Sequence, residues 1–163
     1  MRNLIALVAC VSLTVSLFTF KLERPKTVEQ MAEYCNLSVE EFVLISSVTE
    51  AESNRQQPAE GELTTEGRIL IAVCIFNRVE SDLFNGDTVT EILTAPGQFS
   101  TVRNGNSVTE RTEWSDWAVI EAYNWCQRGD QPQVLFFNCI GYNYGEPYGT
   151  GPIGGNYFMT MES

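Results

Sequence analysis

Two glutamates two positions apart, Glu50 and Glu52, stand at the end of an apolar run in the stretch LISSVTEAESNRQQP, residues 44–58. They matter because the chain has no histidine among its 163 residues. Catalysis by Ser-His-Asp or Cys-His groups, zinc sites of the HExxH type and histidine proton shuttles are therefore excluded. Acid–base chemistry must come from carboxylates, Tyr, Lys or Cys, and 21 Asp and Glu against 10 Lys and Arg make carboxylates the first candidates.

Helical spacing separates the two glutamates. If residues 39–52 form a helix, Glu52 continues an apolar stripe that contains Leu44 and Val48. Glu50 lies roughly 200° around the helix from Glu52, so we expect Glu50 on a solvated face and do not expect the two to act as a pair. Burial raises the pKa of a carboxyl group, and a half-buried glutamate at a helix end is suited to protonate a glycosidic oxygen. The pattern therefore favours Glu52 as a general acid.

Length and composition indicate one globular domain, because 163 residues with 44% apolar composition can bury a core. The formal net charge of −11 lacks the basic surface that phosphate backbones require, so we expect no nucleic acid as a partner. The cysteines show no CxxC pair and no zinc spacing, and we predict no metal and no cofactor. A Cys126–Cys139 disulfide is left open by the sequence. We expect a monomer.

The first 26 residues have the features of an export segment. Arg2 is followed by an uncharged, mainly apolar run over residues 4–20, short for a membrane span and long for the apolar part of a signal peptide. We therefore divide the chain into a signal or signal-anchor segment with a short linker, residues 1–26, and a globular domain, residues 27–163. The protein is expected to be exported or membrane-anchored at the cell envelope. A cleaved signal and a lipoprotein site at LVAC are alternatives, and the positive-inside rule argues against export because of Lys21, Arg24 and Lys26.

Periodicity and capping signals predict several helices. Two are expected within residues 27–53, and the capping box that begins at Ser38 opens the second. A long, largely apolar helix over residues 66–84 is the candidate for the buried centre of the domain. A short helix follows Thr88, and a further one runs over about residues 112–128.

Strand signals are fewer. The Asn-Gly pair at 104–105 indicates a hairpin, and VLFFN at 134–138 reads as a short strand. The Gly- and Tyr-rich segment over residues 141–158 is expected to be irregular. The fold class predicted from this order is α+β, mainly helical, in a small single domain.

The motifs VTEAES, EGRILIAVCIFNRV, VTEIL with GQFS, LFFN and IGGNYF follow one another over residues 42–158. In this order and spacing the chain resembles the SleB-type cell wall hydrolases, which are the spore-cortex-lytic enzymes and their relatives, including phage-borne ones. The resemblance implies a small lysozyme-like, lytic-transglycosylase-like fold. It also implies cleavage of MurNAc–GlcNAc bonds in the glycan strands of peptidoglycan, often as a lytic transglycosylase.

The resemblance carries over to individual residues. The family's catalytic acid is the glutamate of its AE or GE pair, and that position falls on Glu52. The family's FS segment lines the cleft, and its late elements include the position of Asn138. Tyrosines of the Gly-rich loop are further candidates as platforms for sugar rings. The predicted substrate-binding residues are therefore Gln98, Phe99, Ser100, Asn138, Tyr142 and Tyr144.

Two positions depart from the family pattern. Arg55 stands where the family has a second acidic residue, and Asn156 stands where it commonly has His, so neither family residue can be essential in an active protein. One alternative is a catalytically inactive protein that binds peptidoglycan. Another is a structural Glu52, held by backbone groups or by an arginine such as Arg55 or Arg78. Candidates for a second carboxylate, which would make the enzyme a hydrolase, are Glu66, Asp87 and Glu113.

Overall fold

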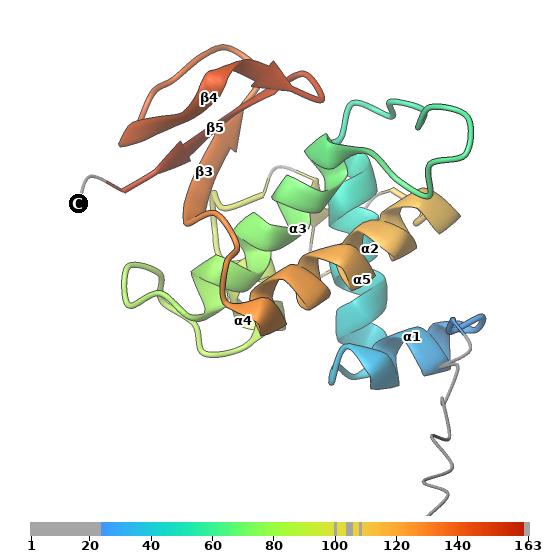
Figure 1. Cartoon of the computed structure of the whole chain (residues 1–163). Coiled ribbons are helices and arrows are strands. Elements are labelled where there is room, and N and C mark those ends of the chain that lie inside the picture. Colours follow the sequence, from blue (N-terminus) through green and yellow to red (C-terminus); the bar gives the residue numbers. More distant parts are fainter. Residues whose placement is uncertain (1–23, 100, 104–105, 108, 162–163) are drawn as a thin grey trace, which may run out of the picture.

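The helices of the domain cross one another beneath a small sheet (Figure 1). The structure is a computed structural model that describes residues 24–99, 101–103, 106–107 and 109–161; most of the predicted export segment and Ser100 lie outside these ranges. The described helices are α1 (Val28–Tyr34), α2 (Val39–Glu52), α3 (Glu66–Val79), α4 (Val89–Thr94) and α5 (Glu113–Arg128). The strands are β1 (Val102–Arg103), β2 (Asn106–Ser107), β3 (Val134–Asn138), β4 (Glu146–Ile153) and β5 (Asn156–Thr160). The predicted α+β, mainly helical fold class is confirmed.

Helix starts lie where the capping signals predict them. The side chains of Ser38, Thr88 and Thr112 each accept a hydrogen bond from the backbone N–H three residues on, at the starts of α2, α4 and α5. Gly129 ends α5 in a left-handed conformation with φ of 72°. The predicted extension of α3 to residue 84 is wrong, because the helix ends at Val79 and the polar residues that follow form turns.

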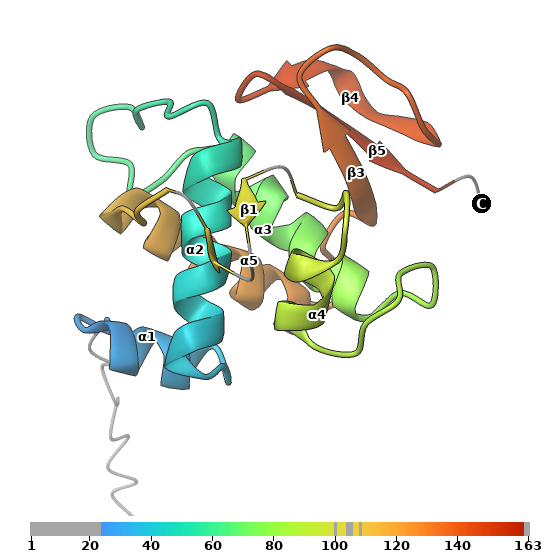
Figure 2. The same ribbon diagram turned by 180° about the vertical axis from the view of Figure 1, so that it is seen from behind.

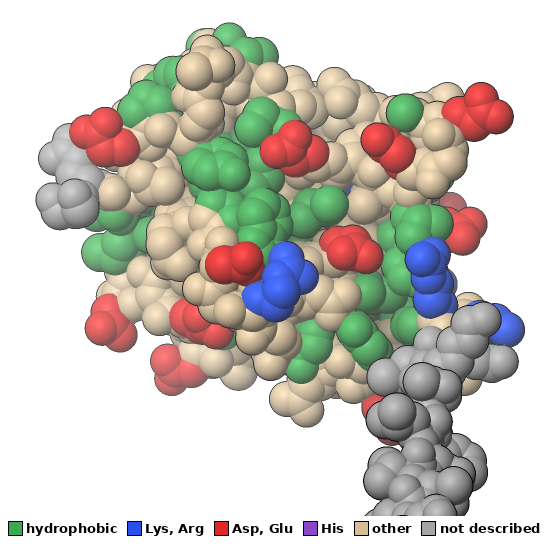
Figure 3. Space-filling view, viewed as in Figure 1, with side chains coloured by type: hydrophobic (Ala, Val, Ile, Leu, Met, Phe, Trp, Pro, Cys, Tyr) green, Lys and Arg blue, Asp and Glu red, His purple; other side chains and the backbone are tan. Residues whose placement is uncertain are grey.

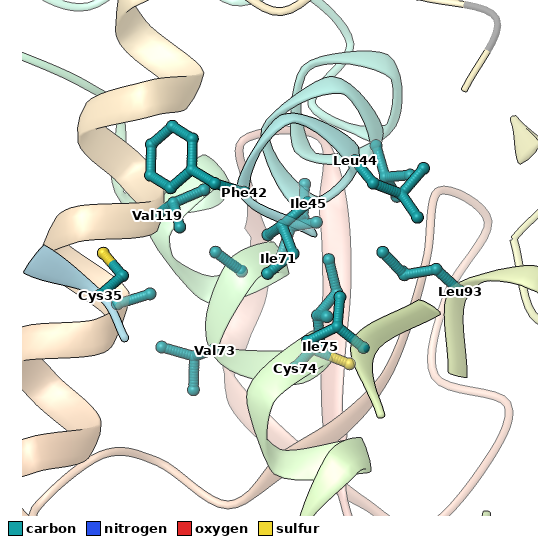
Figure 4. Packing of buried hydrophobic residues seen from close by; sticks show 14 of the residues in the cluster. Cys35, Phe42, Leu44, Ile45, Ile71, Val73, Cys74, Ile75, Leu93 and Val119 are labelled. Carbon is teal, nitrogen blue, oxygen red and sulfur yellow. The ribbon is translucent and has the colours of Figure 1, made fainter. Parts of the chain in front are cut away.

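The core lies where α2, α3 and α5 meet. Phe42 and Ile45 from α2 pack against Ile71 and Ile75 from α3, with Val119 of α5 beside them (Figure 4). All five side chains are buried. Fully burying a side chain of this size stabilises the fold by about 1.5–3 kcal/mol. The core therefore fixes the crossing of α2 over α3, and with it the position of the α2 C-terminus.

The end of the chain corrects one prediction. The segment 141–158, expected to be irregular, contains β4 and most of β5, and these strands join β3 in an antiparallel sheet of order β3-β5-β4. The turn between β4 and β5 contains Gly154 and Gly155, both with positive φ, and such conformations are open to glycine. The segment is therefore ordered by the pairing of β5 with β3 and β4, which its composition does not reveal.

The strands on either side of the Asn-Gly pair form the predicted hairpin, since Val102 pairs with Ser107 and Arg103 with Asn106. The Asn-Gly pair itself lies outside the described residues. Seen from behind, this hairpin crosses in front of α2, while the β3-β5-β4 sheet lies to one side of it (Figure 2). Elements far apart in sequence therefore meet near the C-terminal end of α2. No helix of the described residues is long and apolar enough to cross a membrane.

Candidate active site

Glu52 is the last residue of α2, and its carboxyl group is partly buried. The hydroxyl group of Thr101, in the segment between α4 and β1, donates a hydrogen bond to Oε1 of Glu52 at 3.0 Å. Burial raises the pKa of Glu52, while the Thr101 hydrogen bond and the positive charge of Arg78 act in the opposite direction. The raised pKa keeps the protonated form available at higher pH than for a solvated glutamate, as a general acid requires.

The backbone at Glu52 is held from the sheet. Nδ2 of Asn156, the first residue of β5, donates to the main-chain oxygen of Glu52 at 2.9 Å, and Asn156 is only 4% exposed. That oxygen is one of the carbonyls that a helix end leaves without an intrahelical partner. The position where the family commonly has His is therefore used here to fix the end of α2.

The chain turns sharply after α2. Asn54 and Arg55 both adopt left-handed conformations, with φ of 54° and 53°, and Asn54 lies against Gly155 of the β4–β5 turn. On the other side of that turn, a Cβ atom on Gly67 would lie 2.8 Å from the Cα atom of Gly154. Only glycines permit this approach, which seats the β4–β5 turn on the N-terminus of α3. The glycines of the EGR and IGGN motifs thus place Asn156 beside Glu52.

Arg78 anchors the opposite end of α3 to the sheet. Its Nε atom donates to the main-chain oxygen of Leu135 at 2.7 Å, and its NH1 atom donates to Oε1 of Gln98 at 3.1 Å. The guanidinium also lies 4.9 Å from the ring centroids of Phe84 and Phe99. Arg78 therefore influences Glu52 through charge at longer range. Arg55, the other arginine considered as a partner, is exposed.

The prediction of a solvated Glu50 is wrong. Glu50 is 4% exposed, and its two carboxylate oxygens accept hydrogen bonds from Nε and NH2 of Arg68 at 3.0 and 3.1 Å. The hydroxyl of Thr112 donates to the same carboxylate at 2.8 Å. Arg68 is itself fully buried, at 0% exposure. Glu50 is thus saturated by internal partners, which leaves Glu52 as the carboxylate of the last turn of α2 with an open role.

The physical reason for this error is that α2 is not amphipathic. Residues on all its sides are buried, including Ser46, Ser47 and Thr49, because α1, α3, α5 and the small hairpin surround it. A helical-wheel argument assumes one wet face. Here polar side chains point into a buried network instead, in which Ser46 donates to Asp116 at 2.7 Å and lies 2.8 Å from the hydroxyl of Ser115.

Within the predicted QFS segment, Gln98 and Phe99 make contacts inside the domain. Gln98 accepts its hydrogen bond from Arg78, and Phe99 is 6% exposed and packs on Phe137, with ring centroids 6.2 Å apart. This burial argues against the predicted role of Phe99 as a sugar platform. Ser100 lies outside the described residues. Thr101, the next residue, makes the contact with Glu52 that sequence reasoning missed; its place directly after QFS was the available signal.

The other predicted substrate-binding residues have local contacts. Oδ1 of Asn138 accepts hydrogen bonds from the backbone N–H groups of Ile140 and Gly141 at 2.8 and 2.9 Å, which closes the turn after β3. The hydroxyl of Tyr142 donates to the main-chain oxygen of Gly149 at 3.1 Å. Tyr144 is 65% exposed and packs on Phe136 at 5.5 Å between ring centroids. Tyr144 thus keeps an open aromatic surface on the sheet.

The three candidates for a second carboxylate are exposed and lie on separate elements. Glu66 opens α3, Asp87 precedes α4, and Glu113 opens α5. The groups that shift the pKa of Glu52 are Thr101 and Arg78, and no carboxylate of the described residues is among them. The thiols of Cys126 and Cys139 are free, so the disulfide that the sequence left open is not formed.

Comparisons with known proteins identify a related family and a similar fold. Residues 62–142 match the family described as Cell Wall Hydrolase. Among solved structures, the catalytic domain of the Bacillus cereus SleB protein matches with a TM-score of 0.54 and 23% sequence identity, over 76% of this chain and 91% of that chain. A search of curated proteins finds no match.

Fold and family match together define the class of this protein as a cell wall hydrolase. Residues 62–142, about half of the chain, match the cell wall hydrolase family, and the chain has the fold of the SleB catalytic domain. The predicted family and fold are thereby confirmed. The family match begins at residue 62, after Glu50 and Glu52, so the role of Glu52 stays a prediction.

Proposed function

We propose that the protein cleaves the MurNAc–GlcNAc bonds of peptidoglycan as a lytic transglycosylase, with Glu52 as its single general acid and base. The observation that carries this proposal is the environment of Glu52 at the end of α2. Its pKa is raised by burial, and its carboxyl group has a hydroxyl donor in Thr101 but no carboxylate among the described groups that shift its pKa. A single protonatable carboxyl group fits a mechanism that needs no second carboxylate.

The reaction takes place in two proton transfers. Glu52 gives its proton to the glycosidic oxygen as the bond between that oxygen and C1 of the muramyl residue breaks, and positive charge develops on the ring. The Glu52 carboxylate then removes the proton of the muramyl C6 hydroxyl group, whose oxygen bonds to C1. The products are a 1,6-anhydro-muramyl end and a free GlcNAc hydroxyl group, and Glu52 is protonated again.

The contacts around Glu52 assist both steps. The Thr101 hydroxyl stabilises the carboxylate that exists between the two transfers, and the Arg78 charge acts in the same direction from farther away. Asn156 fixes the main chain at Glu52, which limits the motion of the carboxyl group relative to a bound glycan. Tyr144, with its exposed ring, supports the bound glycan strand farther along the β-sheet. Since peptidoglycan lies outside the cytoplasm, the proposal includes export, with the apolar run at residues 4–20 as the signal.

The test compares three versions of the full chain on purified peptidoglycan, with the soluble products identified by mass spectrometry. The parent is expected to release anhydro-muramyl fragments, and Glu52→Gln is expected to lower their rate of release by about 10²–10⁴-fold. The matched control is Glu60→Gln, an exposed glutamate in the loop after α2, which should behave as the parent.

Other products would decide between the remaining alternatives. Fragments with reducing muramyl ends would mean a hydrolase, and a second carboxylate would then be needed. If the parent released nothing from vegetative or spore-cortex walls but still bound them, the protein would be an inactive binding protein. Equal release by the parent and Glu52→Gln would remove Glu52 from the mechanism.

A further inference from the structure

A pocket lies on the other side of α2 from Glu52. It has a volume of about 950 Å³ and lies between the segment before α1, α1 itself, α2 and the start of α5; we call it the α1–α5 pocket. Val43 and Ser47 of α2 line it. Glu52 points about 140–180° around the helix from these two residues. The α1–α5 pocket is therefore separate from the proposed site of glycan cleavage.

Basic side chains gather at this pocket in an otherwise acidic protein. Arg24, Lys26 and Arg111 line it, although the whole chain has only 10 Lys and Arg against 21 Asp and Glu. Arg68 and Arg78, by contrast, are buried and engaged inside the domain. In Figure 3, blue side chains lie on the side where α1 lies and also near the centre of the face, while red ones are scattered over the rest.

The pocket also has carboxylates and an apolar wall. Glu110 and the exposed Glu113 line it together with Met31, Val28 and Trp117. The guanidinium of Arg24 lies 5.6 Å from the Trp117 ring centroid. Asp116 also lines the pocket and pairs with Arg111, so Arg24 and Lys26 are the cations open to a ligand. A ligand that complements the pocket has carboxylates for these two cations, an amine for the glutamates and an aliphatic chain for the apolar wall.

The pocket is held in shape by the buried polar network. Arg111 forms an ion pair with Asp116, which is 4% exposed and accepts the hydrogen bond of Ser46. Thr112, also in the lining, caps α5 and donates to Glu50. A pocket whose wall is fixed by such contacts needs little reorganisation to bind a ligand.

We infer that the α1–α5 pocket binds the peptide stem of peptidoglycan, a short peptide that carries several carboxylates and a free amine on an aliphatic chain. This inference rests on the proposed function, because it takes the same polymer as the substrate. Since the pocket and Glu52 face different sides of α2, a stem of a neighbouring strand can occupy the pocket while a glycan lies at Glu52. An anionic lipid surface fits less well, because Glu110 and Glu113 would repel it.

The binding test uses the full chain, in a mild non-ionic detergent, and calorimetric titration with the tripeptide L-Ala–γ-D-Glu–meso-diaminopimelate. We expect saturable binding by the parent and about tenfold weaker binding by Lys26→Glu, which replaces an exposed cation. The matched control is Arg128→Glu at the opposite end of α5, where Arg128 pairs with exposed Asp130 at 3.3 Å; it should bind as the parent does. The tripeptide with its carboxylates amidated should bind at least tenfold more weakly.

Several results would overturn the inference: no saturable binding of the tripeptide, equal binding by Lys26→Glu and the parent, or tighter binding of glycerol phosphate as a lipid headgroup probe. Failure of the proposed function is distinguishable from these. Glu52→Gln should bind the tripeptide as the parent does, because Glu52 does not line the pocket. If the parent bound the tripeptide but cleaved no glycan, the binding inference would still be supported and the proposed catalytic function would be contradicted.

Discussion

The two glutamates in the last turn of α2, Glu50 and Glu52, have the same chemistry and opposite surroundings. Glu50 is enclosed by Arg68 and Thr112, so each of its oxygens has an internal partner. Glu52 lies one half-turn later at the helix end, with a single hydroxyl donor and burial that favours its neutral form. The comparison teaches that burial alone does not prepare a carboxyl group for acid catalysis. The absence of a close cation at Glu52 among its described contacts is what leaves the proton available.

The largest expected effect tests the Glu50 side of this comparison. Glu50→Ala leaves the Arg68 guanidinium buried without its counter-ion, and we expect the free energy of unfolding to fall by about 3–5 kcal/mol. Chemical denaturation measures this change. Glu121→Ala, an exposed position on α5, is the matched control and should stay within about 0.5 kcal/mol of the parent.

A double variant separates the charge effect from lost packing. Glu50→Leu combined with Arg68→Met removes both charges and keeps side-chain volume, so it should recover most of the lost stability. If Glu50→Ala cost less than about 1 kcal/mol, the ion pair would not be the structural support described here. If folded Glu50→Ala lost as much activity as Glu52→Gln while remaining stable, the roles assigned to the two glutamates would be exchanged.

A smaller effect is expected at the contact that holds the Glu52 main chain. Asn156→Ala removes the donor to the Glu52 carbonyl, which should cost about 1–2 kcal/mol of stability. The release of anhydro-muramyl fragments should fall by about tenfold, because the end of α2 can then fray and the carboxyl group loses its fixed position. Thermal unfolding and product release are measured together.

The control for this variant is Asn143→Ala, an exposed asparagine beside the same sheet, which should leave both quantities unchanged. A loss of stability in Asn156→Ala without any loss of rate would show that the α2 terminus does not need this anchor for catalysis. Asn156 would then be a purely structural replacement for the family's His.

Much of the fold could be predicted from the sequence because its signals are local. The predicted capping boxes at Ser38 and Thr88 depend on residues three positions apart, and the Asn-Gly hairpin depends on two neighbours. The strands β4 and β5 could not be predicted, since their order comes from pairing with β3 and from turns at Gly154 and Gly155. The composition of a segment does not show which other strand it will pair with.

The site was predictable only in part, for the same reason. The helical position of Glu52 is a local property, and the spacing of α2 indicates it. The partners of both glutamates are distant: Arg68 comes 18 residues after Glu50, Thr101 comes 49 after Glu52, and Asn156 comes 104 after Glu52. Helical periodicity assigns Glu50 to solvent, and this is wrong because other elements cover that side of α2. The sequence of α2 itself does not show that they do.

The smallest expected effect is a shift in pH dependence, and it addresses the Glu52 side of the comparison. The Thr101 hydroxyl donates to the ionised carboxylate, so Thr101→Val should raise the pKa of Glu52 further above its already raised position. In the proposed mechanism, cleavage requires protonated Glu52 and is lost as pH rises through this pKa, so the falling limb of the rate profile should move to higher pH. Thr101→Ser keeps a hydroxyl donor and should retain the parent profile.

The same shift has a consequence for stability, with a definite sign. A carboxyl group whose pKa is higher in the folded state binds more protons there than in the unfolded chain over the interval between the two values. Its contribution to stability is therefore complete below the unfolded value of 4.5 and is lost as pH rises through the folded pKa. Thr101→Val widens that interval, so its stability should fall with pH over a longer range than that of the parent or Thr101→Ser. If the falling limb of the rate profile stayed in place or moved to lower pH, the Thr101 hydroxyl would not stabilise the charged form of Glu52. The raised pKa of Glu52 would then not be opposed by Thr101.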